Sequence, residues 1–170
     1  MREAISAIPD GIYNARTHID GYLDSPDPAL NELPIKSTLT VKGSDIQVNL
    51  TGTAPQTQNK PINMPCVGTV DCAVLLRSIL LDSDVYGSIP QNSGLTRPIT
   101  IHAPLGCLAN PIYPAPVIAR LCPGNALADT IMKAIAPAVL RPVSADIGNL
   151  RVMAFSGVST GAPWVKLKGV

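Results

Sequence analysis

Two runs of alternating apolar and polar residues, joined by a turn, constrain the fold of this chain more than any other feature. Apolar residues fill every second position of 35–41 except Ser37, and again of 46–50, with polar residues between them. Successive side chains of a strand point to opposite faces, so each run is typical of a half-buried strand. Gly43, Ser44 and Asp45 supply the turn. The sequence therefore predicts an antiparallel hairpin.

Two other segments have the composition of buried helices. Val67–Leu81 is apolar on nearly every face, so it needs neighbours all round. A second helix is predicted to start near Gly124 and to end or kink at Pro137. Its predicted inner face consists of Leu127, Ile131, Ala134 and Ile135.

The remaining segments complete a mixed α+β prediction. Residues 11–23 and 99–103 are predicted to be extended, and 51–65 forms a long loop without periodicity. The last twenty residues hold strand-like residues with weak patterning. We therefore expect one segment, 1–170, of the α+β class, with an antiparallel hairpin and two largely buried helices.

Charge and length limit the classes of function. The 170 residues include 13 basic and 12 acidic side chains, a net charge of +1, which argues against nucleic acid as a partner. Charged residues make up only 15%, well below the usual quarter. So few charged residues leave little sequence to cover an independent surface, and the helix predicted at Arg2 begins without an N-cap. We therefore expect the chain to be part of a larger subunit.

No membrane or export signal is expected. The longest uncharged run, Pro98–Ala119, is interrupted by four prolines at 104, 111, 114 and 116, which excludes a spanning helix. The first ten residues lack the apolar core of a secretory signal. We therefore expect a cytoplasmic protein that does not bind membranes.

The cysteines and histidines form no recognisable metal or catalytic motif. Cys66, Cys72, Cys107 and Cys122 contain no C-x-x-C pair, which favours reduced, mostly buried thiols over zinc ligands or disulfides. His18 and His102 lie in strand-like segments. Each could act as a base or ligand, but solvated side chains on a strand are the favoured interpretation. No metal ligand is assigned.

Two polar loops beside apolar segments are the candidate sites. In the loop Gln56–Asn63, amides such as Asn63 can recognise ligand donors and acceptors without carrying charge. In the second, Asn92–Arg97, the guanidinium can bind a carboxylate or phosphate through two hydrogen bonds. The alternative is that these side chains satisfy the backbone of their own loops. Asn63, Asn92 and Arg97 are the substrate-binding candidates.

Several short motifs, in order along the chain, give a family resemblance. LTGTAPQ at 50–56 followed by PINMP at 61–65 resembles the FSGTxPQ…GPxNxP signature of the hydantoinase B/oxoprolinase family. PDGIY at 9–13 resembles its PDGxY segment, and NSG at 92–94, RPI at 97–99 and PLG at 104–106 are also similar. Leu50, Lys60 and Pro123 depart from the pattern, which has Phe, Gly and Gly there.

The resemblance implies the middle of a hydantoinase B-like subunit. Such subunits use ATP to open cyclic amides, hydantoins or 5-oxoproline, in hetero-oligomers with a hydantoinase A-like, ATP-binding partner. ATP and a divalent metal are implied for the full complex, which also includes the remainder of the hydantoinase B-like chain. The family's metal ligands precede the PDGxY segment, so no cofactor is expected here and the isolated segment is expected to be inactive.

Two alternatives remain open. A subunit of an ATP-dependent ketone carboxylase, of the acetone or acetophenone type, has a similar architecture. A non-catalytic assembly module is the alternative from a different class of protein. A complete enzyme of either kind is expected to contain a metal. The metal content of the assembled complex therefore distinguishes the assembly module from both enzymes.

Overall fold

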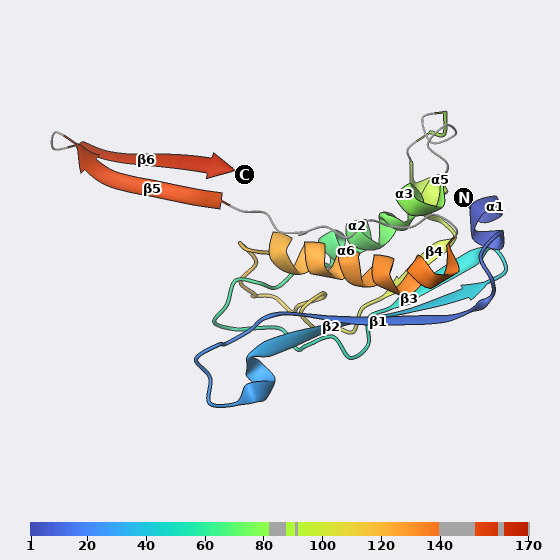
Figure 1. Ribbon diagram of the computed structural model, residues 1–170, viewed down its shortest axis with the longest axis horizontal. Coiled ribbons are helices and arrows are strands. Elements are labelled where there is room, and N and C mark those ends of the chain that lie inside the picture. Colours follow the sequence, from blue (N-terminus) through green and yellow to red (C-terminus); the bar gives the residue numbers. More distant parts are fainter. Residues whose placement is uncertain (82–87, 91, 140–151, 160–161, 170) are drawn as a thin grey trace.

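The computed structural model describes residues 1–81, 88–90, 92–139, 152–159 and 162–169. A four-stranded sheet organises it, in the order β1 (Gly11–Asp20), β2 (Glu32–Lys42), β3 (Asp45–Asn49) and β4 (Ile99–His102). The first three strands are antiparallel, and β4 runs parallel to β3. Helices cover one face of this sheet (Figure 1). The α+β class is therefore confirmed.

The predicted hairpin is β2–β3. Its strands pair from Thr38 opposite Asn49 to Lys42 opposite Asp45, with Gly43 and Ser44 at the turn. Gly43 has a φ of 59°, a left-handed conformation that a glycine adopts without a steric penalty. The turn residues and the alternating pattern of the two strands therefore both account for the hairpin.

The core lies between the sheet and the helix α6 (Leu121–Ile135), which lies over the sheet in Figure 1. Alternate residues of β2 point into it, among them Ile35 and Leu39, which are almost fully buried. On β1, Thr17 reaches α6 through a hydrogen bond between its hydroxyl and that of Thr130. Full burial of an aliphatic side chain contributes about 1.5–3 kcal/mol, so this layer carries much of the stability.

The predicted inner face of α6 is confirmed, since all four of its residues are buried. The helix begins at Leu121, three residues before the predicted start. Pro123 lies in its first turn, where a missing N–H costs nothing. It ends at Ile135, and Pro137 lies in the short 3-10 turn η2 (Ala136–Ala138) that follows.

The segment predicted as one all-apolar helix differs from that prediction in two respects. It forms two helices, α2 (Cys66–Val74) and α3 (Leu76–Leu80), interrupted at Leu75. Within the described part of the chain, α2 is covered on one face only: Val67 is 70% exposed and Val70 is 40% exposed. The expectation that neighbours surround this segment is not met by the residues seen here.

Short elements connect these layers. They are α1 (Arg2–Ser6), the 3-10 turn η1 (Pro28–Leu30) and α5 (Ser93–Thr96). The strand-like tail forms a second hairpin, β5 (Val152–Ser159) with β6 (Ala162–Gly169). Figure 1 shows it apart from the four-stranded sheet.

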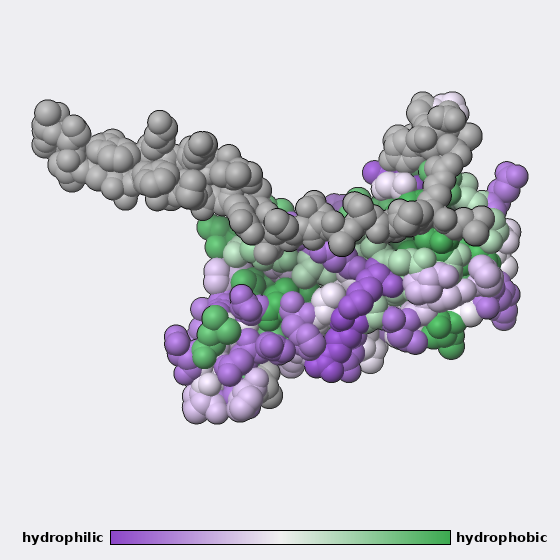
Figure 2. Space-filling model, viewed as in Figure 1, coloured by the Kyte–Doolittle hydropathy of each residue, from purple (hydrophilic) through white to green (hydrophobic). Residues whose placement is uncertain are grey.

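The sheet face opposite α6 is polar. Asn14, Thr38, Asn49 and His102 lie in one row across all four strands, and Thr38 donates to Asn14 over 2.7 Å. Hydrophilic residues gather on the side of the molecule away from α6 in Figure 2. The polar half of the alternating pattern therefore faces away from the core.

Candidate functional site

The amide of Asn63 holds the loop 51–65 in its shape. Asn63 is fully buried. Its Oδ1 accepts from the Thr57 N–H over 2.8 Å, and its Nδ2 donates to the carbonyls of Thr57, at 2.8 Å, and Pro116, at 2.9 Å. The amide thus closes its own loop and joins it to a distant one. This geometry matches the backbone-satisfying alternative, and substrate binding by Asn63 stays a prediction.

A second amide fixes the start of the same loop. The Gln56 side chain pairs with the backbone of Ile112, accepting from its N–H at 2.6 Å and donating to its carbonyl at 3.3 Å. The backbone N–H of Gln56 donates to Gly106 over 2.9 Å. Because one amide supplies both a donor and an acceptor, it can replace a backbone partner in an irregular loop. Two amides therefore fix the segment that carries the family-like motif.

A pocket of about 750 Å³ lies between this loop and the loop that follows β1. Lys60 connects its two sides: its Nζ donates to the Gly21 carbonyl and lies 5.3 Å from the centre of the Tyr22 ring. We name it the loop pocket; its walls are residues 22–25, Leu30, Leu33 and 55–60. Its volume suits a small molecule.

Gly21 allows the two ends of the loop that follows β1, on one side of the loop pocket, to approach each other. A Cβ at this position would lie 2.1 Å from the carbonyl oxygen of Leu30, closer than atoms can come. The Gly21 N–H donates to Asn31 over 2.8 Å, so the backbone itself forms this contact. Only a glycine allows this close backbone approach.

The other two candidates, Asn92 and Arg97, lie together. They line a surface depression of about 500 Å³, which Arg2 of α1 also lines. Asn92 caps α5, since its Oδ1 accepts from the Gly94 N–H at 2.9 Å. Arg97 follows α5 directly and is exposed. The structure thus groups Asn92 with Arg97, and Asn63 is not among the residues that line this depression.

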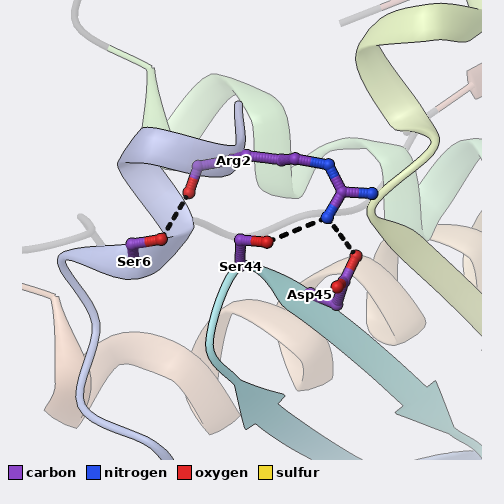
Figure 3. Close-up of polar contacts among 4 residues, drawn as sticks. All are labelled: Arg2, Ser6, Ser44 and Asp45. Carbon is purple, nitrogen blue, oxygen red and sulfur yellow. Dashed lines mark hydrogen bonds and ion pairs between the residues drawn. The ribbon is translucent and has the colours of Figure 1, made fainter.

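Arg2 is the residue that sequence reasoning missed. Its Nη1 donates to Ser44 Oγ at 2.9 Å and to Asp45 Oδ1 at 2.8 Å, at the β2–β3 turn (Figure 3). These contacts span more than forty residues, so no local spacing indicates them. Ligand binding by Asn92 and Arg97 stays a prediction.

A comparison with known families adds to this geometry. The family model described as hydantoinase B/oxoprolinase matches residues 1–168. The chain belongs to the hydantoinase B/oxoprolinase family. The motif-based resemblance is thereby confirmed, and Pro55 and Gln56 of that motif line the loop pocket.

Relatives of this hydantoinase B family chain are much longer. It is 61% identical, over 97% of its length, to a Pseudomonas protein named as the B-type subunit of a "Putative D-/L-hydantoinase", of which it covers 28%. It is 30% identical, over 67% of its length, to an uncharacterized protein from Methanocaldococcus jannaschii, of which it covers 19%. The chain therefore spans less than a third of each of these curated relatives.

A solved structure has the same fold. The crystal structure of an ATP-dependent caprolactamase from Pseudomonas jessenii matches with a TM-score of 0.68 and 25% identity. The match covers 82% of this chain and 23% of the caprolactamase chain. The fold described above is therefore a segment of a larger enzyme in that neighbour.

The described residues hold no group of three or more His, Cys, Asp or Glu side chains that could bind a metal. Both histidines are exposed on their strands, in agreement with the favoured interpretation. None of the helices seen in the structure is long and apolar enough to cross a membrane.

The cysteine prediction is half right. All four thiols are free, but Cys66 and Cys122 are exposed, so "mostly buried" is wrong. Cys66 is the first residue of α2 and Cys122 the second of α6, and both lie on surfaces that nothing in the described part covers. Burial raises the pKa of Cys107. Burial, together with the neighbouring charge of Asp71, raises the pKa of Cys72 from 9.0 to about 11.

This shift predicts a loss of stability at alkaline pH. Between pH 9 and 11 the native state keeps the Cys72 proton while the unfolded chain loses it, so the free energy of unfolding falls as the pH rises. Urea unfolding at pH 8 and pH 10.5 measures the fall. Cys72→Ala should show a shallower decline between the two pH values. An unchanged pH dependence in this variant would contradict the assignment.

Proposed function

We propose that this chain is part of an ATP-dependent cyclic-amide hydrolase that opens hydantoin or 5-oxoproline rings. The observation that carries the proposal is the 61% identity, over nearly the whole chain, to a protein named as a hydantoinase subunit. The fold shared with an ATP-dependent caprolactamase supports it, because a caprolactam is also a cyclic amide. A B-type subunit implies at least one partner, and we propose a hydantoinase A-like, ATP-binding one.

We further propose that the loop pocket forms one wall of the substrate site. The aromatic face of Tyr22 and the side chain of Leu33 offer apolar surface to a ring. Gln58 and Asn59, both exposed at the rim, offer the donors and acceptors that an amide ring needs. ATP, when bound by the partner, supplies the phosphoryl group that activates the amide oxygen.

The chain's own residues position rather than transform the substrate in this proposal. The bonds of Gln56 and Asn63 to distant backbone groups keep the loop rigid before a ligand arrives. Lys60 holds the two sides of the pocket together and adds its single positive charge. A rigid, preformed wall lowers the ordering cost of binding.

The decisive experiment uses the full-length chain together with its A-type partner. We expect ring-opened product from hydantoin or 5-oxoproline, formed only with ATP and in step with ADP release. Fixation of bicarbonate onto acetone or acetophenone by the same complex, without ring opening, would replace this proposal with the carboxylase alternative. A complex without metal and without either activity would favour an assembly module.

Lys60→Met tests the pocket within that complex. The substitution keeps the side-chain length but removes the charge and the bond to Gly21. We expect KM to rise several-fold with a smaller change in kcat, because the pocket binds but does not react. Lys42→Met, an exposed lysine at the end of β2, is the matched control. Equal KM values in both variants would exclude the pocket from the substrate site.

A further inference from the structure

We infer that the depression lined by Arg2, Asn92 and Arg97 is an oxyanion site, one that takes a carboxylate or a phosphate group. We name it the arginine depression. It stands on the geometry of these residues and does not depend on which reaction the complete enzyme performs. It lies on a different set of loops from the loop pocket, since the residues that line the two sites are all different.

Arg97 supplies the uncompensated charge of the site. Its side chain is exposed and makes no hydrogen bond or ion pair with any residue that the structure describes. Among the residues that the structure describes, no Asp or Glu lines the arginine depression. A planar guanidinium offers parallel N–H groups that match the two oxygens of a carboxylate or phosphate.

Arg2 supplies a second guanidinium that is already oriented. Ser44 and Asp45 accept from its Nη1, and Ser6 Oγ donates to the Arg2 carbonyl over 3.0 Å, as Figure 3 shows. The two bonds occupy Nη1 and leave the donors of Nη2 and Nε for a ligand. The Asp45 carboxylate offsets only one of the two guanidinium charges in this region.

Asn92 adds a neutral donor. The bond from the Gly94 N–H occupies its Oδ1, so the acceptor end of the amide is used locally and the two amide hydrogens remain available. The side-chain groups of Arg2, Asn92 and Arg97 that these bonds leave open are therefore donors. These donor side chains, together with the charge of Arg97, which no described carboxylate offsets, favour an anion over a neutral or cationic ligand.

The walls of the arginine depression favour a bound ion over two solvated arginines. Pro90 and Pro98 restrict the backbone on either side of the site, and Leu95, which is buried, contributes apolar surface. Apolar walls reduce the local dielectric and strengthen each charge-assisted bond. Pro98 also fixes the chain to the sheet, since its carbonyl accepts from the Ile46 N–H over 2.8 Å.

Titration with two anions tests the site. Inorganic phosphate and acetate are added in turn to the protein with ¹⁵N-labelled arginines, at constant ionic strength maintained with chloride. We expect the Nε–H resonances of Arg2 and Arg97 to shift with a saturating dependence on the anion. Saturation with phosphate alone identifies a phosphate site, and saturation with acetate as well identifies a general oxyanion site that also accepts a carboxylate.

Three variants separate a specific site from charge screening. Arg97→Gln should weaken the affinity about tenfold, the effect of one charge-assisted bidentate contact. Asn92→Asp keeps a good helix cap but puts a negative charge among the donors, so it should abolish binding. Arg16→Gln, on the open face of β1, removes an equal charge elsewhere and should leave the affinity unchanged.

Two results would overturn the inference. One is the absence of any saturable shift of Arg2 or Arg97 up to about 50 mM of either anion, well above a millimolar dissociation constant. The other is a loss of affinity in Arg16→Gln as large as that in Arg97→Gln. Both substituted arginines are exposed, so neither variant is expected to affect folding.

Discussion

Replacing Leu39 with alanine is expected to lower the free energy of unfolding by about 3–5 kcal/mol. Leu39 is 0% exposed at the middle of β2, the strand that lies between β1 and β3 and faces α6. Truncation removes apolar surface from the core and leaves a cavity that this central strand cannot close by moving. Because a domain of this size is stable by only about 5–15 kcal/mol, the loss is a large part of the total.

The same sheet provides a matched control for Leu39. Ile12 on β1 points to the opposite face and is 67% exposed, so Ile12→Ala should change the free energy of unfolding by less than about 0.5 kcal/mol. Urea unfolding followed by circular dichroism measures both variants. Similar losses in the two would contradict the assignment of one buried and one open face to this sheet.

The contrast between these faces was predictable because it is a local property of the sequence. Alternation specifies which side chains of β2 and β3 are buried, and Gly43 specifies where the chain reverses. The pairing of β3 with β4 was not predictable in this way. More than forty residues separate Val48 from its partner Ile101, and strands far apart in a chain pair by tertiary packing rather than by any spacing.

Helix ends were harder to predict than helix faces. The inner face of α6 repeats with helical period, so its buried residues were evident from the sequence. Its three extra residues at the start were not, because Pro123 and Gly124 resemble a terminus and yet occur within the helix. The interruption at Leu75 follows no breaker residue, so an apolar run of this kind contains no local signal for it.

The candidate sites show the same contrast between local features, which the sequence reveals, and long-range contacts, which it does not. Polar loops beside buried segments were visible as motifs, and both loops do line depressions. The long-range neighbours were not visible. Pro116, which bonds to Asn63, and Gly21, which bonds to Lys60, are distant in sequence, and so is Arg2, which lines the same depression as Arg97. A loop's function depends on these long-range partners, so its sequence indicates a candidate and leaves its role to be tested.

Asn63→Asp is expected to lower the free energy of unfolding at pH 7 by about 3–5 kcal/mol, the effect of an uncompensated buried charge. The new carboxylate would still accept from the Thr57 N–H, but it would face the carbonyls of Thr57 and Pro116 without a proton to donate. Burial raises the pKa of such a carboxylate above the usual 3.9 or so, because the charged form is disfavoured. The penalty should therefore shrink as the pH falls from the raised pKa of the folded state towards about 4, below which the group is protonated in both states.

This pH dependence distinguishes a structural role of Asn63 from a purely ligand-binding one. Asn59→Asp is the control, since Asn59 lies on the same loop but is exposed, and its unfolding free energy should change little. Urea unfolding of both variants at pH 7 and pH 3.5, each relative to the unsubstituted chain, gives the comparison.

If Asn63→Asp were as stable as Asn59→Asp at pH 7, the amide could not be what holds the loop, and the substrate-contact prediction for Asn63 would become the better account. A selective penalty at pH 7 that is relieved at pH 3.5 would show that Asn63 shapes the pocket from behind, by fixing the backbone that Gln58, Asn59 and Lys60 share.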